Sequence, residues 1–333
     1  MLQLHNDTPF SATMFVLSDR AGVDTLVVPV QAVLTWETGR LRIADQQRPI
    51  PLVDECGEDS ATASVRYPGE VRLAPPGTDI IILGEAHAPR ARPTTTCDVA
   101  VHVGSIHHAA RVVGDRTWEP GVAGLRASQP RPFTSMPLGH ERAVGGREEP
   151  VNPIGRGLRS GRSNGALIGT PLPNVESIDA PLKSPDQRPP PVGFGAIPPA
   201  WLPRRTYAGT YDAAWRRTRA PYLPQDLDLR FFHAAAPGLA SRAPLSGGEL
   251  VELHLLSPRE RDSFILPSCL ASVEVRLADA SYRPALQLVT VLLEPTSARV
   301  TLVWQAALAC DGRPLYIDAV TVRAVATDAI GGL

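Results

Sequence analysis

Proline is the residue that most limits what this chain can fold into, because it occurs 34 times in 333 positions. A proline fixes its own φ angle and lacks the N–H group that an interior helical or strand position must donate. At about twice the usual share, the prolines leave little room for long helices. They are also uneven, since 19 of them lie between Pro120 and Pro237. We therefore expect short elements, with an irregular Pro- and Gly-rich centre between two more regular parts.

Alternation of apolar and polar residues predicts strands on both sides of this centre. Cys97, Val99, Val101 and Val103 alternate with polar residues, a period of two that is typical of a half-buried strand. Residues 107–113 follow Gly104 and are expected to form its hairpin partner. Further strands are predicted at 13–18, 23–35, 40–43, 80–83, 250–255, 273–277, 286–293, 300–304 and 316–325. The fold class predicted is mainly β, with antiparallel sheets in a sandwich or an open barrel.

The central segment is expected to be ordered although it is irregular. Short helices are predicted at 211–220, ended by Pro221, and at 227–233. A disordered linker would lack aromatic residues, yet this segment contains Phe133, Phe194, Trp201, Tyr207, Tyr211, Trp215, Tyr222, Phe231 and Phe232. We divide the chain into an N-terminal β-rich part (1–119), a Pro-rich centre (120–245) and a C-terminal β-rich part (246–333), which together can form one compact unit.

Charge is balanced overall but not along the chain. The net charge of −1 gives no overall field toward nucleic acid or membrane. Between Arg126 and Arg219, however, there are 14 basic and 7 acidic residues, and the remainder of the chain is acidic. Two interpretations stay open: an acidic partner for the centre, or pairing of arginine with carboxylates inside the fold.

The expected cellular compartment follows from the targeting and membrane-spanning segments that we do not find in the sequence. Residues 1–10 show neither a basic nor an apolar leader region, and no apolar run is long enough to span a bilayer. The four cysteines are far apart and are expected to be reduced thiols: Cys56, Cys97, Cys269 and Cys310. We expect a cytoplasmic protein without a membrane partner.

A match to the nucleophile elbow G-x-S-x-G runs from Gly161 to Gly165 and includes Ser163. The elbow requires a buried strand before the first glycine and a helix after the last. The preceding residues do not form such a strand, and Gly169 and Pro171 leave no room for a helix. An ordered Gly- and Arg-rich loop is the preferred interpretation, and a serine hydrolase that uses Ser163 stays as an alternative.

Other chemical groups are weaker candidates. His102 could approach His107 or His108 on paired strands, with His87 not far along the chain, but no metal-binding motif accompanies them. The carboxylate pairs Glu148/Glu149 and Asp226/Asp228 are too close in sequence to face each other across a cleft, and the second pair is expected to carry charge at a helix N-terminus. Neither a metal nor a cofactor is predicted.

Basic and aromatic residues alternate in Trp201-Leu202-Pro203-Arg204-Arg205-Thr206-Tyr207. Such a pattern can stack single-stranded bases. Because arginine is almost the only base used in this chain, with Lys183 as the single lysine, the pattern is weak support for nucleic-acid binding. A carbohydrate or nucleic-acid binding module remains a second alternative.

Spaced blocks over nearly the whole chain resemble one bacterial family. The blocks include "PGTDIIILGEAHAP", "PFTSMPLGHERAVGG", "NPIGRGL", "LPNVE", "PPVGFGAIPPAWLPRRTYAGTYDAAW", "LPQDLDLRFFHAAAP" and "LSGGELVELHLL". They are similar to the bacterial domain of unknown function 2169, which is associated with effector adaptors and chaperones of the type VI secretion system. Val144 departs from the phenylalanine that is usual in that family, and the loop after Gly146 is short.

The resemblance implies an adaptor without catalysis. Its expected partners are a secreted effector protein and a VgrG or PAAR-like spike component, onto which the effector is loaded in the cytoplasm. The family supplies no catalytic residues to carry over. Arginine and aromatic side chains dominate protein contacts, so the candidate partner-binding residues lie in the centre: Arg142, Asn152, Arg156, Trp201, Tyr207 and Tyr211. The competing interpretation of each is internal scaffolding.

Overall fold

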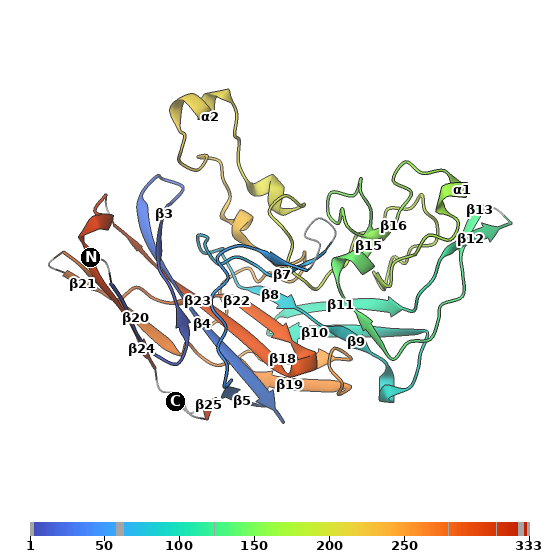
Figure 1. The fold of residues 1–333 in the computed structure, drawn as a ribbon, viewed down its shortest axis with the longest axis horizontal. Helices are drawn as coiled ribbons and strands as arrows, with labels where there is room; N and C mark the ends of the chain where they lie inside the picture. The colour runs from blue at the N-terminus through green and yellow to red at the C-terminus, as the bar shows by residue number, and fades with distance from the viewer. Residues whose placement is uncertain are drawn as a thin grey trace.

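The computed structural model describes residues 3–57, 63–122, 124–278, 280–310, 312–325 and 330–331. The fold is mainly β, with several antiparallel sheets and no closed barrel among these residues, as the sequence predicts. Figure 1 shows the strands crossing the body of the molecule while the helices stay short and peripheral. No helix within the described ranges is long and apolar enough to cross a membrane.

The largest sheet has eight strands and is built on two long antiparallel partners, β4 (Asp24–Glu37) and β23 (Arg299–Ala309). Strand order along the main path is β25-β5-β4-β23-β22-β8, and two short strands also pair with β4. β22 lies between β23 and β8 and is buried along most of its length, which confirms the central strand predicted at 286–293. The other members are β2 (Ser11–Ala12), β3 (Phe15–Ser18), β5 (Arg40–Ile43), β8 (Asp79–Ile82), β22 (Gln287–Glu294) and β25 (Ile330–Gly331).

Two further sheets pack beside it. The five-stranded sheet has the order β17-β11-β10-β18-β19 and contains the hairpin predicted around Gly104. The four-stranded sheet has the order β1-β24-β20-β21, with β1 parallel to β24. Their strands are β17 (Val175–Glu176), β11 (Ile106–Val113), β10 (Thr96–Val103), β18 (Leu250–His254), β19 (Arg261–Ile265), β1 (Gln3–Asp7), β24 (Ile317–Ala324), β20 (Ala271–Leu277) and β21 (Ala280–Tyr282).

The remaining elements are small. Four strand pairs stand apart from the large sheets: β6 (Glu55–Cys56) with β7 (Val65–Tyr67), β9 (Glu85–His87) with β14 (Ser135–Pro137), β12 (Trp118–Gly121) with β13 (Gly124–Ala127), and β15 (Val144–Gly145) with β16 (Arg156–Gly157). The α-helices are α1 (Asn164–Leu167) and α2 (Ala213–Thr218). Single 3-10 turns occupy η1 (Pro89–Ala91), η2 (His140–Arg142), η3 (Arg204–Tyr207), η4 (Leu229–Phe232), η5 (Pro295–Ser297) and η6 (Pro314–Tyr316).

The helix predictions for the centre are partly correct. The helix expected at 211–220 exists but is only α2, and residues 227–233 contain the 3-10 turn η4 rather than an α-helix. The expectation that no helix follows Gly165 is wrong, because α1 completes one turn there before Gly169. One turn fits because the side chain of Ser163 caps its N-terminus.

One hydrophobic core joins the N- and C-terminal parts. Strands from the two ends alternate in the sheets, so that β4 pairs with β23, β8 with β22, and β10 with β18. The main core includes buried side chains from all three predicted parts, and the rings of Trp36 and Phe264 stack 4.8 Å apart between β4 and β19. A smaller core forms around the centre, and Trp118 of the N-terminal part contributes to it; its other members are Val144, Leu158, Leu167, Leu172 and Leu182.

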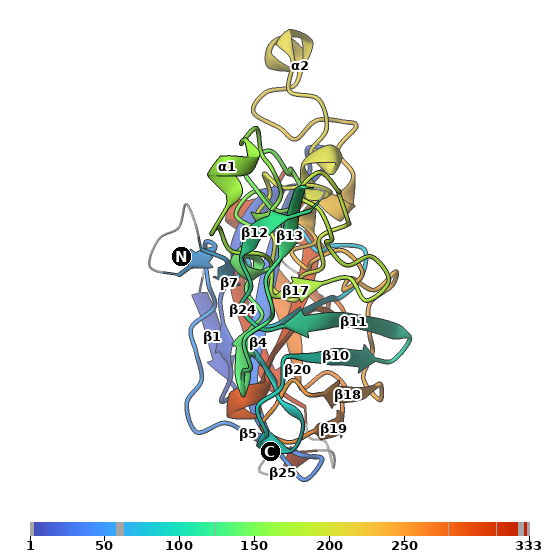
Figure 2. The ribbon, with the colours of Figure 1, turned by 90° about the vertical axis from the view of Figure 1, so that its right-hand side faces the viewer.

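An arm of residues 208–227 projects from this body and carries α2 at its tip. Both ribbon views show it standing clear of the sheets (Figures 1 and 2). Its two ends meet at the body, where the backbone N–H of Asp228 donates to the carbonyl of Tyr207 at 3.0 Å. Buried aromatic side chains anchor the rest of the centre, as expected from the sequence: Phe133, Phe194, Trp201 and Phe232.

Candidate binding site at the base of the arm

Local hydrogen bonds fix the shape of the arm. The carboxylate of Asp226 accepts from the backbone N–H of Thr210 at 3.0 Å and from its hydroxyl at 2.7 Å, and these bonds lower the pKa of Asp226. Gly209 has φ +78°, and a Cβ there would lie 2.8 Å from Pro224. The arm therefore turns back on itself through contacts that other residues at 209 would strain.

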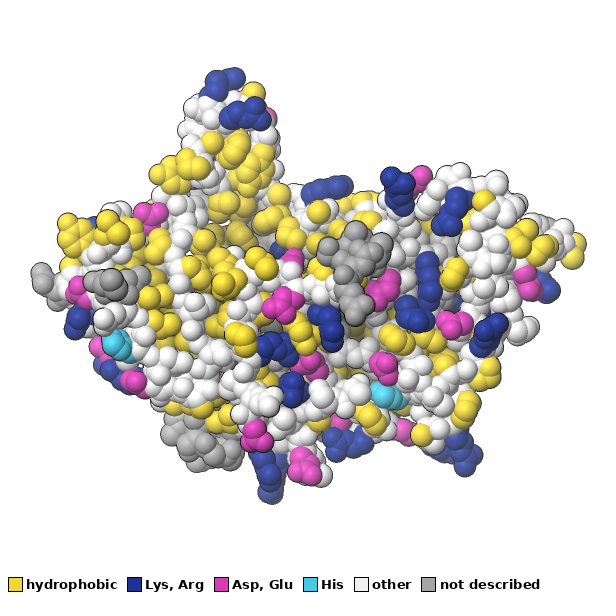
Figure 3. Space-filling view, viewed as in Figure 1, with side chains coloured by type: hydrophobic (Ala, Val, Ile, Leu, Met, Phe, Trp, Pro, Cys, Tyr) yellow, Lys and Arg dark blue, Asp and Glu magenta, His cyan; other side chains and the backbone are white. Residues whose placement is uncertain are grey.

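The tip of the arm displays aromatic side chains on a short helix. The side chain of Asp212 caps α2 by accepting from the N–H of Trp215 at 2.8 Å. The indole N–H of Trp215 donates to the carbonyl of Tyr222 at 3.0 Å, and the Tyr211 ring meets the Trp215 ring edge-on at 4.8 Å. Tyr211 is 52% exposed and Tyr222 42% exposed. Figure 3 shows hydrophobic side chains gathered on the arm and at its foot, with basic ones at the tip.

One arginine ties the arm to the body. Arg219 Nη2 donates to the carbonyl of Arg20 at 2.6 Å, and its Nε donates to the carbonyl of Leu223 at 2.9 Å. Arg20 lies in the turn between β3 and β4, so the arm leans against that hairpin. The exposed rings are therefore presented by a braced element, which lowers the entropy lost on binding.

A buried charge network forms the floor beneath the arm. Arg72 Nη1 donates to Asp79 Oδ2 at 2.9 Å, and Arg72 Nε donates to Glu70 Oε2 at 3.2 Å. The other oxygen of Asp79 bonds His233 Nδ1 at 2.7 Å, and Thr290 Oγ1 links Arg72 to Glu70. Every charge in this network has a partner, which is the condition for keeping charges inside a fold.

Burial and pairing shift the titration of these groups in opposite directions. Burial raises the pKa of Glu70, and the charge of Arg72 offsets that only in part. Burial also opposes ionisation of Asp79, but the hydrogen bond from His233 and the charge of Arg72 lower its pKa overall. For Arg72 burial alone would lower the pKa, and the charges of Glu70 and Asp79 raise it instead.

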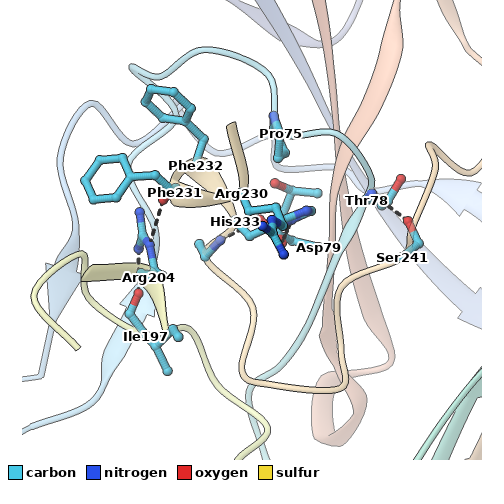
Figure 4. Close-up of polar contacts among 12 residues, drawn as sticks. Pro75, Thr78, Asp79, Ile197, Arg204, Arg230, Phe231, Phe232, His233 and Ser241 are labelled. Carbon is cyan, nitrogen blue, oxygen red and sulfur yellow. Dashed lines mark hydrogen bonds and ion pairs between the residues drawn. The ribbon is translucent and has the colours of Figure 1, made fainter. Parts of the chain in front are cut away.

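A cleft of about 490 Å³ opens between this floor and the foot of the arm, within the size range of ligand pockets. Much of its wall is apolar, formed by Pro76, Ile197, Pro203, Ala235, Pro237 and Ala240. Its polar members are Arg204, Tyr207, Asp228, Arg230, His233, Ser241 and Arg242. Figure 4 shows Arg204 on one side of this region and His233 with Asp79 on the other.

Arg204 is the unusual side chain of the cleft, because it is buried without a carboxylate partner in the described part of the chain. It is 7% exposed, and it donates from Nη1 to the carbonyl of Ile197 at 2.5 Å and from Nε to that of Phe231 at 3.1 Å. Burial, together with the charge of Arg72, lowers its pKa to about 10. The group therefore stays cationic at neutral pH while its bonded acceptors are neutral.

Two of the six predicted partner-binding residues lie inside the fold. Asn152 is 1% exposed, and its amide donates to the carbonyls of His140 at 2.8 Å and Val144 at 3.0 Å. Trp201 is 9% exposed and meets the ring of His140 edge-on at 5.4 Å. Both residues scaffold the centre, so the interpretation as surface contacts is corrected for them.

Arg142 and Arg156 converge on one internal acceptor. Arg142 Nη1 donates to Asn174 Oδ1 at 3.0 Å, and Arg156 Nη2 donates to the same oxygen. Asn174 is fully buried, and burial lowers the pKa of Arg156. These two arginines form a half-buried cluster away from the arm, with Arg142 side chain 32% exposed.

Tyr207 and Tyr211 are the predicted residues that the structure places at the candidate site. The Tyr207 ring lines the cleft and lies 4.3 Å below the guanidinium of Arg230, a cation–π contact. Tyr211 lies further out on the arm and is half exposed. The helix N-terminus predicted for the pair Asp226/Asp228 holds for Asp228 alone, whose side chain accepts from the N–H of Arg230 at the start of η4. Asp226 bonds Thr210 instead.

The other sequence candidates have local roles. Ser163 Oγ accepts from the N–H of Ala166 at 3.4 Å as the cap of α1, and the residues before Gly161 form a turn rather than a buried strand. His102 and His107 do face each other, with ring centroids 4.2 Å apart on paired strands. Among the described residues, no group of three or more His, Cys, Asp or Glu side chains is arranged to hold a metal ion.

Sequence reasoning missed the residues that build the cleft and its floor. Asp79 carries the one available signal, a carboxylate at the head of the apolar run 80–83, which is costly to bury unless it is paired. No pattern in the sequence distinguishes Arg204, which is buried, from Arg205, which is exposed. The distinction depends on which side of η3 faces the body.

The family assignment follows from comparison with known proteins. A model of an uncharacterized protein family conserved in bacteria, DUF2169, matches residues 21–305. No curated protein and no solved structure matches this chain. The matched range includes the whole five-stranded sheet, the arm, the cleft and most of the eight-stranded sheet, but not β1 and β24 of the four-stranded sheet. The chain therefore belongs to the uncharacterized bacterial family DUF2169.

Proposed function

We propose that this chain is a non-catalytic adaptor that binds another polypeptide through the arm and the cleft at its foot. The observation that carries the proposal is the braced arm, which holds Tyr211 and Tyr222 exposed beside basic residues of α2. Rigid aromatic side chains and arginines supply most of the binding energy in protein interfaces. A braced arm offers them without a large ordering cost.

The resemblance read from the sequence names the partners for this proposal. They are a secreted type VI effector, which the adaptor would keep soluble in the cytoplasm, and a VgrG or PAAR-like spike component. The apolar face of the arm suits an effector that would otherwise expose hydrophobic surface. β19 is an edge strand of the five-stranded sheet, and it offers a second mode, in which main-chain hydrogen bonds extend a sheet.

Co-expression with a candidate type VI effector protein tests the proposal directly. A pull-down followed by size-exclusion chromatography should recover a complex with the wild-type chain. The variant Tyr211→Ser/Tyr222→Ser should lose most of the complex, because it removes two exposed rings from the arm.

The control is Tyr282→Ser/Tyr316→Ser, which removes two exposed tyrosines, 40% and 60% exposed, from the region of the four-stranded sheet. This variant should form the complex as the wild type does. Equal loss in both variants, or no complex at all with the wild type, would refute an adaptor that binds through its arm.

A further inference from the structure

We infer that the cleft binds a carboxylate of a polypeptide partner, an Asp or Glu side chain flanked by an apolar residue, with Arg204 and Arg242 as its cationic contacts. The inference rests on the proposed function in one respect, which is that the occupant is a polypeptide. The carboxylate chemistry itself follows from the side chains that line the cleft.

The guanidinium of Arg204 has one edge that can still donate to an anion. Its Nε and Nη1 donate to the carbonyls of Phe231 and Ile197, which are neutral. Its Nη2 has no hydrogen-bond partner among the described residues, and it is not one of the buried polar atoms sealed from solvent. Because Arg204 lines the cleft and its Nη2 is not sealed from solvent, we infer that a ligand in the cleft can reach this edge of the guanidinium. The hydrogen bond from Arg204 to a charged acceptor there would become stronger as water leaves the cleft.

The other charges of the cleft leave a cationic surplus. Arg230 pairs with Asp228 at 2.6 Å, so these two lining groups neutralise each other. Arg242 is exposed at the cleft and has no ion pair or side-chain hydrogen bond with any described residue. Asp79 lies behind His233 and is engaged by Arg72. Arg204 and Arg242 therefore remain as the cations of the cleft without a carboxylate of their own.

The apolar residues of the cleft wall select the rest of the ligand. Ile197, Ala235, Pro237 and Ala240 give an apolar surface of small and stiff residues, which suits an aliphatic or aromatic side chain next to the carboxylate. Tyr207 belongs both to the cleft and to the foot of the arm. A bound segment can thus continue from the cleft along the arm to Tyr211, which a small free acid would not do.

Selection from a displayed library of random dodecapeptides against the full chain tests this inference. Selected peptides should share an Asp or Glu beside an apolar residue. The best peptide is then synthesised with its acidic residue intact and with the amide in its place, and both are titrated against the wild type and Arg242→Ala. Each single change should weaken binding about tenfold, the loss expected for one charge-assisted contact.

Titrating the amide peptide against Arg242→Ala completes a double-mutant cycle, and this is the sharpest measurement. If the carboxylate contacts Arg242, the amide peptide should bind Arg242→Ala no more weakly than it binds the wild type. Arg40→Ala removes an equally exposed arginine of β5 and should leave every affinity unchanged. Arg204→Lys keeps the charge but loses the planar guanidinium. Once its melting temperature shows that it folds, this variant should bind the acidic peptide more weakly than the wild type does and should bind the amide peptide equally well.

Peptides selected without an acidic residue, or additive losses in the cycle, would overturn the inference. Binding of benzoate that depends on Arg242, with no peptide selected, would also overturn it by making the cleft a site for small acids. Non-additive losses of peptide affinity in the double-mutant cycle, together with a failed effector pull-down, would support the carboxylate site and refute the adaptor proposal instead.

Discussion

Arg72 Nη1 lies 2.9 Å from Asp79 Oδ2, and the two side chains are only 6% and 0% exposed. This ion pair joins the loop before β8 to the first residue of that strand, beneath the cleft. Through His233 and the carbonyl of Phe232, which also accepts from Arg72, the pair reaches the segment that carries the arm. The floor is thus bonded directly to the segment that follows the arm in the chain.

Removing the charge of Asp79 should destabilise the whole fold. Asp79→Asn leaves the buried Arg72 with Glu70 alone, and breaking a buried pair costs about 3 to 5 kcal/mol. Urea unfolding at neutral pH measures the loss. Asp318→Asn is the control, because its pair with Arg276 is 3.4 Å long and both side chains are more than half exposed; its effect should stay below about 0.5 kcal/mol. Equal effects would mean that the buried network contributes little.

Stability should fall in mild acid, and His140 should be one cause beside His87 and His108, because burial lowers the pKa of all three. Burial lowers the pKa of His140 from its ordinary 6.5, although its hydrogen bond to Gly195 O opposes this. The folded state therefore binds fewer protons than the unfolded one, so stability is present above pH 6.5 and declines as the pH falls below it. His140→Asn should flatten this slope in urea unfolding between pH 7.5 and 5.5, whereas the exposed His5→Asn should not. Identical slopes in all three proteins would contradict the assignment.

Asn152 should matter for stability rather than for binding. Asn152→Ala leaves the buried carbonyls of His140 and Val144 without their donor, a loss of about 1 to 3 kcal/mol. Thermal unfolding should show the loss, while the folded variant should bind a partner as the wild type does. Asn164→Ala, at an exposed position, should change the unfolding free energy by less than about 0.5 kcal/mol. Weaker binding with unchanged stability would restore Asn152 as a surface contact.

Ser163 should behave as a helix cap. Ser163→Ala removes the acceptor for the N–H of Ala166 and should cost about 0.5 kcal/mol or slightly more, and Ser163→Gly less. A panel of p-nitrophenyl esters should show the same background hydrolysis with both variants and with the wild type. Ester turnover that disappears in Ser163→Ala would instead support the serine hydrolase.

Thiol labelling should separate the cysteines. Burial, with the nearby charge of Asp98, raises the pKa of the Cys97 thiol to about 11, so little thiolate forms at pH 8. Iodoacetamide followed by mass spectrometry should modify the half-buried Cys56 first, and the buried Cys97 and Cys310 last or not at all. Cys56→Ser should abolish the fast phase. Rapid modification of Cys97 would show that its strand opens easily.

Local patterns predicted most strands because their causes are local. Alternation along 97–103 and the turn at Gly104 correspond to β10 and β11, and the apolar run 286–293 corresponds to the central strand β22. Side-chain period and turn chemistry act between near neighbours in the chain, so the sequence alone displays them. The short hairpin of β12 and β13 was missed because Pro120 and two glycines weaken its strand pattern.

The sequence by itself determined a mainly β chain of short elements with an ordered, aromatic-rich centre, because proline and period-two patterning constrain each residue's own backbone. The tertiary structure alone decided which strands pair across the chain, that Asn152 and Trp201 are interior, and that Arg204 is buried in the wall of a cleft without a carboxylate partner among the described residues. Those outcomes depend on contacts between residues as distant in sequence as Arg72 and Thr290. Whether an arginine is buried, and what it meets there, is set by the packing of elements and not by its neighbours in the chain.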